Sequence, residues 1–294
     1  MVLLLALGAI ILFSVKVRQS IASAPKLQCL PETAIAPESL PFLSVIIPAY
    51  NEAERIAPTL RSFNNYLASR KITYEILVVD DGSTDNTVDL VRSLQTEIPV
   101  LQVIVQPRNE GKGAAVRTGM LQAKGKIRLF SDADGSTPVE EINKLLPALQ
   151  AGTADIAIGS RYLEGAEIDK AQPKFRVVWS RFANQIVQRV LLPGIVDPHC
   201  GFKAFTAEAA EKIFPLCKVN EWSFDLEVLA YARSLNLRIA EFPVKWANDE
   251  RSKGRISQLP KEILNLYRIK KRQRYSNKTS RRRKLARFFA KQEF

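Results

Sequence analysis

Histidine and cysteine are scarce in this chain, and their scarcity excludes two kinds of site. The 294 residues include one histidine, His199, and three cysteines, none of which form a Cys-x-x-Cys pair. A zinc centre needs several such ligands at short spacings, so we expect none here. The cysteines also lack the pattern of a disulfide framework and favour a reducing compartment. His199 is interpreted as a structural or loop residue, or as a partner of a neighbouring acid.

The apolar amino-terminal run is short for a membrane span. Residues 1–15 are apolar except for Ser14, and Lys16 and Arg18 follow them. As a helix this run would be about 22 Å long, against about 30 Å of hydrocarbon. No positive charge precedes it, which argues against a signal peptide. We expect residues 1–18 to be a short or tilted membrane anchor, with the remaining chain on the cytoplasmic side. A helix that lies on the membrane or packs on the domain is the alternative.

Acidic residues are almost absent from the carboxyl-terminal end. From Arg268 to Phe294 the chain has twelve Lys or Arg and one acid, so this stretch carries +11 of the net charge of +13. A basic tail on a nearly neutral body indicates an anionic surface as partner and argues against nucleic acid. We expect residues 273–294 to be a membrane-proximal tail. A merely solvated or disordered tail is the alternative.

Between these ends, strand-like and helix-like segments alternate. Residues 19–42 hold several prolines and are predicted to be a linker, and residues 43–272 are predicted to form one domain. Strands are expected at 43–48, 74–80, 100–105, 127–131, 155–159 and near 238–246, and helices at 52–69, 84–95, 112–124, 138–150, 176–192, 223–235 and 259–272. This alternation predicts an α/β fold with a mostly parallel sheet flanked by helices.

Two carboxylates directly follow the fourth predicted strand. Asp132 and Asp134 flank Ala133 and precede Gly135. Open α/β sheets bind ligands at the carboxyl ends of their strands. Paired carboxylates at that edge suit Mg²⁺ or Mn²⁺ that also holds a substrate diphosphate. For an isolated Asp-x-Asp, a solvated acidic turn is the alternative.

The first three strands also end in segments that could bind a ligand. The segments are Pro48-Ala49-Tyr50-Asn51-Glu52, Asp80-Asp81-Gly82-Ser83-Thr84-Asp85 and Asn109-Glu110-Gly111-Lys112-Gly113. A carboxylate at such a strand end can accept hydrogen bonds from ribose hydroxyls or a base N–H. Lys112 supplies a cation. Taken singly, each segment is more often an ordinary loop.

Together and in this order, these segments resemble glycosyltransferase family 2. The resemblance implies a GT-A (Rossmann-like) fold, in which the first two segments hold the nucleotide and Asp-x-Asp holds the metal. It assigns a nucleotide-sugar site to Pro48, Ala49, Tyr50, Glu52, Asp81, Lys112 and Asp132, and a metal site to Asp132 and Asp134.

The second half of the chain is similar to the polyprenyl-phosphate glycosyltransferases, and most of all to the dolichyl-phosphate β-glucosyltransferases. The matching motifs are Ile158-Gly159-Ser160-Arg161-Tyr162, the pair Arg176 and Ser180, Asp197-Pro198-His199-Cys200-Gly201-Phe202-Lys203 and Trp222-Ser223-Phe224-Asp225-Leu226-Glu227. The resemblance implies that a hexose, with UDP-glucose as the favoured donor, is transferred to a polyprenyl phosphate at a membrane surface. It also implies that Arg161, Arg176 and Ser180 bind the acceptor phosphate.

The residues themselves agree with a phosphate site. Arg176 and Ser180 are four residues apart and share one helix face, and a guanidinium matches phosphate oxygens. An ordinary exposed helix face is the alternative. Lys253 resembles a basic residue that closes over the donor diphosphate, although Arg251 could do the same.

The expected catalytic residues are Asp134 and Asp197. Asp197 follows a predicted helix break, where it would face the sugar or assist the nucleophile. Asp225 is interpreted as a possible structural acid. His199 and Arg251 depart from the residues usual in the family, and both could shift sugar or acceptor preference.

The expected chemistry is direct and inverting. A lipid phosphate is largely dianionic at pH 7 and needs little help from a base, so positioning and electrostatics do most of the work. Three alternatives stay open: a family 2 enzyme with another donor, such as GDP-mannose, or a non-lipid acceptor; an inactive sugar-nucleotide-binding scaffold; and a nucleic-acid-binding protein that uses the basic tail.

Overall fold

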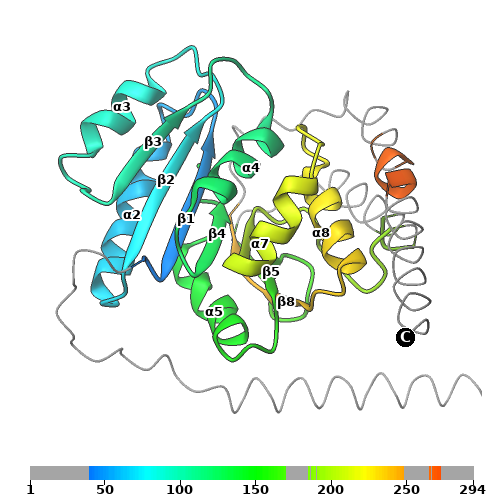
Figure 1. Cartoon of the computed structure of the whole chain (residues 1–294). Helices are drawn as coiled ribbons and strands as arrows, with labels where there is room; N and C mark the ends of the chain where they lie inside the picture. The colour runs from blue at the N-terminus through cyan, green and yellow to red at the C-terminus, as the bar shows by residue number, and fades with distance from the viewer. Residues whose placement is uncertain are drawn as a thin grey trace, which may run out of the picture. The chain divides into compact units, whose positions relative to one another are not determined.

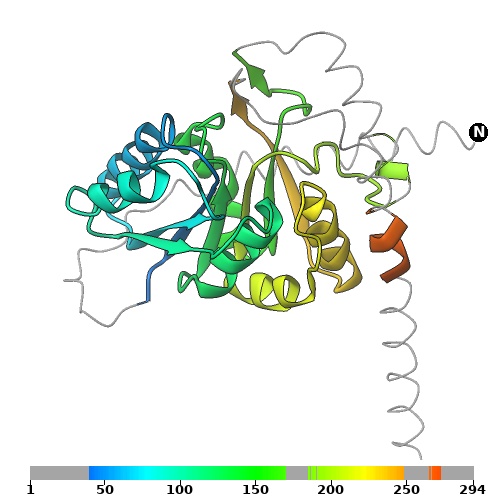
Figure 2. The same ribbon diagram turned by 90° about the horizontal axis from the view of Figure 1, so that it is seen from above.

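A seven-stranded sheet forms the centre of the protein (Figure 1). The computed structural model describes residues 40–169, 185, 187–189, 191–247, 265 and 267–272. The sheet strands are β1 (Leu43–Ala49), β2 (Tyr74–Asp80), β3 (Leu101–Val105), β4 (Ile127–Ser131), β5 (Ile156–Ser160), β7 (Phe202–Thr206) and β8 (Ile239–Pro243). Their order is β3-β2-β1-β4-β7-β5-β8. A separate ribbon of β6 (Glu167–Ile168) and β9 (Lys245–Trp246) lies beyond the end of β8 (Figure 2).

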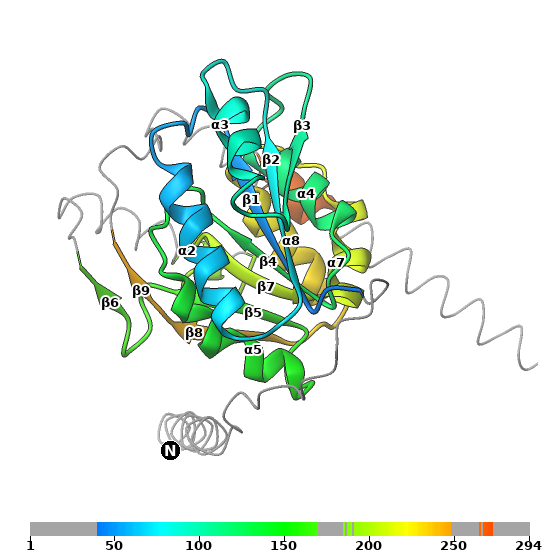
Figure 3. The same cartoon turned by 90° about the vertical axis from the view of Figure 1, so that its left-hand side faces the viewer.

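Helices cover both faces of the sheet (Figure 3). The helices are α2 (Ile56–Ser69), α3 (Thr87–Leu94), α4 (Lys112–Gln122), α5 (Ile142–Gln150), α7 (Ala207–Ile213) and α8 (Phe224–Ser234), with short 3-10 turns η1 (Val139–Glu141) and η2 (Phe214–Leu216). Helices α2 and α5 lie on one face, and α4, α7 and α8 share a core with the sheet on the other. Every residue of β1, β4 and β5 is buried, as expected for strands of a covered parallel sheet. The prediction of a mostly parallel sheet flanked by helices is confirmed.

Strand order brings three strand ends together. β1 lies between β2 and β4 and is parallel to both. The chain adds strands on one side of β1 as far as β3 and then crosses to its other side for β4. Such a switch point leaves a crevice outside the carboxyl ends of the strands. The segments that follow β1, β2 and β4 therefore meet at one edge of the sheet.

One strand of the central sheet and the helix after it are not expected from the sequence, and neither is the short strand β6. β7 is antiparallel to its neighbours β4 and β5, and Ser131 of β4 pairs with Phe202 of β7. All but the last of its five residues are buried, including Lys203, so the segment shows no apolar–polar alternation that would predict a strand. Helix α7 follows β7 without a break. Through β7, the motif at 197–203 lies directly beside Asp132.

Several expectations lie outside the described residues. These are the anchor at 1–18, nearly all of the linker at 19–42, the tail at 273–294 and most of the helices expected at 176–192 and 259–272. Residues 267–272 are helical, and Ile269 is buried in the core beside α8. Within the part of the chain that the structure describes, no helix has both the length and the apolar character needed to cross a bilayer.

Candidate active site

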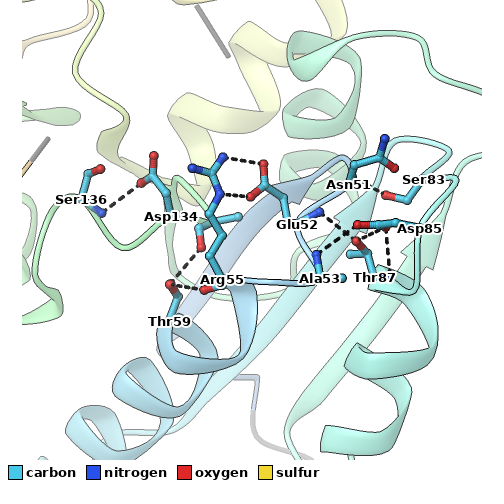
Figure 4. A network of polar contacts seen from close by, with 11 residues as sticks. Asn51, Glu52, Ala53, Arg55, Thr59, Ser83, Asp85, Thr87, Asp134 and Ser136 are labelled. Carbon is cyan, nitrogen blue, oxygen red and sulfur yellow. Dashed lines mark hydrogen bonds and ion pairs between the residues drawn. The ribbon is translucent and has the colours of Figure 1, made fainter. Parts of the chain in front are cut away.

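The loops that follow β1 and β2 are joined by hydrogen bonds (Figure 4). The Asn51 backbone N–H donates to Ser83 Oγ at 2.8 Å, and the Glu52 N–H donates to Thr87 Oγ1 at 2.8 Å. Asn51 has a φ of 53°, and asparagine tolerates this left-handed conformation better than most residues. These contacts hold Tyr50, which is 36 % exposed, at the rim of the strand edge. The two segments predicted to hold a nucleotide thus form one hydrogen-bonded unit.

Asp81 holds the loop that precedes α4. Its Oδ1 accepts the Glu110 N–H and its Oδ2 accepts the Gly111 N–H, both at 2.8 Å. Burial raises the pKa of Asp81, these two hydrogen bonds lower it, and the neighbouring Asp80 charge raises it further, with a net increase. Gly111 has a φ of 105°, which favours glycine. Asp81 therefore fixes the position at which Lys112 begins the helix.

Lys112 forms an ion pair with the first carboxylate of Asp-x-Asp. Its Nζ lies 2.5 Å from Asp132 Oδ1 and 4.6 Å from the centre of the Trp222 ring. The pKa of Lys112 is raised, because the charges of Asp132, Asp225 and Asp134 outweigh the effect of burial. The sequence predicted both Lys112 and Asp132 as ligands of one donor, and the fold brings them into direct contact.

Asp134, the second carboxylate, lies on the α2 side of the same loop. Its Oδ1 accepts the Ser136 N–H at 3.0 Å (Figure 4). Burial raises the pKa of Asp134, and the adjacent Asp132 charge raises it further. Arg55 is the nearby cation that opposes this increase, and its Nη2 donates to Glu52 Oε1 at 2.8 Å. Glu52, predicted to contact the nucleotide, is thus buried and paired with a residue that sequence reasoning missed.

A cavity of about 330 Å³ opens beside Asp134. Its lining includes Arg55, which precedes α2, and Thr59 and Phe63 of α2. Gly135 and Val139, which follow β4, line it from the other side. Thr59 Oγ1 donates to the Ala133 carbonyl at 2.9 Å, which joins α2 to the centre of Asp-x-Asp. Asp134 therefore borders open space, and the loop that carries it is held to α2 by this hydrogen bond.

The donor set fits a hard divalent cation that the substrate also ligates. Asp132 and Asp134 supply carboxylate oxygens, the ligands that Mg²⁺ and Mn²⁺ prefer. Among the described residues, no group of three or more His, Cys, Asp or Glu side chains is arranged to hold a metal. Because Mg²⁺ is commonly held by one or two carboxylates plus substrate phosphates, two protein ligands are sufficient for such a site.

Arg161 and Asp197, predicted on separate grounds, are bound to each other. Asp197 is fully buried and accepts from the Arg161 backbone N–H at 2.9 Å, from Nε at 2.7 Å and from Nη2 at 2.8 Å. The Arg161 guanidinium also lies 5.4 Å from the ring centres of Tyr162 and Trp246. The pair fixes the guanidinium beside the end of β5.

The Asp197 pair leads to a pH-dependent stability prediction. Burial alone would raise the pKa of Asp197, but the charge and hydrogen bonds of Arg161 hold that pKa below its ordinary value of 3.8. A depressed carboxyl pKa stabilises the fold above about pH 4, and this stability is lost as pH falls toward the folded-state pKa. We expect Asp197→Asn to cost about 2 kcal/mol at pH 7 and less as pH falls below 4. Urea unfolding of wild type and variant at pH 7 and pH 3.5 measures both costs.

The exposed Asp89→Asn variant is the matched control, since Asp89 lies on the solvent side of α3. Its cost should be small at both pH values. A cost of Asp197→Asn that stays constant or grows on acidification would contradict the assigned coupling.

A second buried ion pair, which sequence reasoning did not assign, lies next to the Phe130 ring of β4. Lys203 is 1 % exposed, and its Nζ donates to Asp225 Oδ1 at 2.6 Å and to the Cys200 carbonyl at 2.5 Å. Gly201, between these residues, faces Asp132 so closely that a Cβ would overlap the carboxylate. Gly201 and Lys203 both belong to the motif at 197–203. The resemblance of this motif to the family is the signal of their importance in the sequence.

The remaining predicted residues divide into two groups. Pro48 and Ala49 form the buried end of β1 at the strand edge. Arg176, Ser180 and Lys253 lie outside the described residues, so their assignment to the acceptor phosphate and the donor diphosphate stays a prediction.

Sequence comparison identifies the family of the chain. The model of glycosyl transferase family 2 matches residues 44–214. A dolichyl-phosphate beta-glucosyltransferase of Trichomonas vaginalis is 38 % identical over 247 residues, covering 81 % of this chain and 73 % of that protein. The human dolichyl-phosphate beta-glucosyltransferase is 37 % identical over 224 residues, covering 72 % of this chain and 69 % of that protein.

Structural comparison gives the same fold. A glucosyl-3-phosphoglycerate synthase from Mycobacterium tuberculosis, solved with Mn²⁺, UDP-glucose and phosphoglyceric acid, superposes with a TM-score of 0.60 at 18 % identity, over 78 % of this chain and 80 % of that one. The mannosyltransferase PcManGT from Pyrobaculum calidifontis, solved with GDP-mannose and Mn²⁺, gives 0.52 at 21 % identity, over 84 % and 66 %. At these identities the likeness concerns the fold, which is of the GT-A type.

Proposed function

We propose that this chain, which belongs to glycosyl transferase family 2, transfers glucose from UDP-glucose to dolichyl phosphate. That the chain is a glycosyltransferase follows from the family. The choice of sugar and acceptor is inferred from relatives named for that reaction, 37–38 % identical over most of this chain.

The observation that carries the proposal is the position of Asp132 and Asp134. Both follow β4 at the switch point of the sheet, beside the joined loops after β1 and β2. A nucleoside diphosphate sugar bound along these loops would place its diphosphate at the two carboxylates. Like charges would repel there, so a divalent cation is required between them.

The donor-side residues have distinct tasks in this proposal. Tyr50 and the loop held by Asp81 border the nucleotide, and Lys112 provides a positive charge near the diphosphate. Asp132 and Asp134 hold Mg²⁺ or Mn²⁺, which when bound stabilises negative charge on the leaving diphosphate. Lys253 is proposed to close over the same diphosphate.

On the acceptor side, Arg161 with Arg176 and Ser180 is proposed to bind the lipid phosphate. Asp197 is completely buried and accepts three N–H groups of Arg161. We therefore propose that Asp197 orients the Arg161 guanidinium, whereas the sequence predicts that it faces the sugar or assists the nucleophile. A dianionic phosphate oxygen attacks the anomeric carbon as UDP leaves from the opposite side, and this single displacement converts an α-linked donor into a β-linked product.

The acceptor requires the enzyme to work at a membrane surface. The segment 1–18, with its apolar run, and the basic tail 273–294 are proposed to provide that contact, with the catalytic domain on the cytoplasmic side. Basic residues near an anionic leaflet each contribute about 1 kcal/mol to such binding.

The test is transfer from labelled UDP-glucose in membranes that contain the protein, Mg²⁺ and dolichyl phosphate, beside an Asp134→Ala control. We expect label in an acid-labile lipid and its loss in the control. Transfer from GDP-mannose but not from UDP-glucose would show that the donor is GDP-mannose and would keep the rest of the mechanism. A product with retained anomeric configuration would overturn the single displacement. No transfer from any nucleotide sugar would favour an inactive sugar-nucleotide-binding protein.

A further inference from the structure

Lys112 forms an ion pair with Asp132, one of the two carboxylates proposed to bind the metal. Its ammonium nitrogen lies 2.5 Å from Asp132 Oδ1, within direct ion-pair distance. The Trp222 ring packs against the same nitrogen at 4.6 Å and the Phe130 ring at 5.4 Å. A cation site formed by one carboxylate and two aromatic faces is thus already filled by a side chain of the protein.

The neighbouring acids Asp225 and Asp134 also attract this ammonium, but each is engaged with another partner. Asp225 is bound to Lys203 at 2.6 Å, and Asp134 Oδ1 accepts the Ser136 N–H at 3.0 Å. Lys112 starts α4, and its backbone position is fixed because Asp81 holds the preceding Gly111. The ammonium can therefore form an ion pair either with Asp132 or with an anion that binds at the carboxyl ends of the strands.

We propose that Lys112 blocks the metal site of the ligand-free protein and is drawn from Asp132 by the donor diphosphate, so that the divalent cation and the nucleotide bind together. This inference rests on the proposed function and assigns Lys112 an additional role as an internal competitor of the metal. Metal alone meets an occupied carboxylate and a positive charge. Metal with a diphosphate meets a free carboxylate, because the ammonium can then pair with the phosphate oxygens.

Thermodynamic linkage makes this arrangement measurable. If UDP strengthens Mn²⁺ binding by some factor, Mn²⁺ strengthens UDP binding by the same factor. Part of that factor arises because the diphosphate itself ligates the metal, and Lys112 adds the rest. Removal of the ammonium should therefore strengthen Mn²⁺ binding in the absence of UDP and reduce the additional strengthening that UDP provides.

The experiment is Mn²⁺ binding to the purified full-length protein, followed by the electron paramagnetic resonance signal of free Mn²⁺, with and without UDP. We expect Lys112→Met to bind Mn²⁺ alone at least about tenfold more tightly than wild type, at the low end for close charge pairs. Lys112→Arg keeps the charge and should resemble wild type. Lys124→Met removes an exposed lysine just beyond the other end of α4 and should change nothing.

The outcomes separate this inference from the proposed function. Mn²⁺ binding that depends on UDP in wild type but is unchanged or weaker in Lys112→Met without UDP would overturn the blocking role alone. Mn²⁺ binding without UDP that becomes equally tight in Lys124→Met would also overturn the blocking role, since the effect would then reflect the net charge of the protein. Absence of Mn²⁺ binding in every variant, with and without UDP, would overturn the metal site itself.

Discussion

Gly201→Ala is expected to lower glycosyl transfer at least about a hundredfold without unfolding the protein. The Gly201 carbonyl accepts the Asp132 backbone N–H at 3.2 Å, and a Cβ at this position would overlap the Asp132 carboxylate. The carboxylate must then rotate away from Lys112 and from any metal. A displacement of about 1 Å at a reacting centre can cost a hundredfold in rate. Initial rates with UDP-glucose, or with whichever donor proves active, measure the effect.

The matched control is Gly152→Ala, because a Cβ at Gly152 meets no atom within 4 Å. Gly152 has a φ of 63°, and an alanine in this left-handed conformation costs about 1 kcal/mol of stability, but the transfer rate should be unchanged. Melting temperatures of both variants separate a displaced carboxylate from an unfolded chain. A Gly201→Ala enzyme with a normal rate would show that the position of Asp132 is not critical.

Lys203→Met is expected to destabilise the fold by about 3–5 kcal/mol. Lys203 and Asp225 are both almost fully buried and pair at 2.6 Å. Removal of the ammonium leaves the Asp225 carboxylate in the interior without its counter-charge, and this loss is larger than the value of an exposed ion pair. Urea unfolding followed by tryptophan fluorescence measures the change in the free energy of unfolding.

The double variant Lys203→Met with Asp225→Leu removes both charges and should recover most of that stability, because an apolar pair of similar volume can replace a buried ion pair. Lys212→Met is the matched control, since the exposed Lys212–Glu208 pair on α7 is half in solvent. A double variant as unstable as Lys203→Met would indicate that packing around Lys203, rather than its charge, stabilises this region.

The local sequence pattern determined the class of fold and the position of the Asp-x-Asp motif in it. Apolar runs predict the strands at 43–48, 74–80 and 127–131, because a strand covered on both faces is apolar throughout. The alternation of strands and helices then required a parallel sheet, whose strand ends meet at one edge. Asp132 and Asp134 could be assigned to that edge because they directly follow such a run.

Only the tertiary structure decided which charges neutralise one another. Lys112 meets Asp132, Arg161 meets Asp197 and Lys203 meets Asp225, and each pair joins residues 20 or more positions apart in the sequence. The antiparallel insertion of β7 beside β4 brings Gly201 to Asp132 and Lys203 to Phe130. Residue type and spacing indicate that a charge will need a partner, since a buried charge is costly alone. Strand order and register select the partner, because they set the distances between residues far apart in the chain.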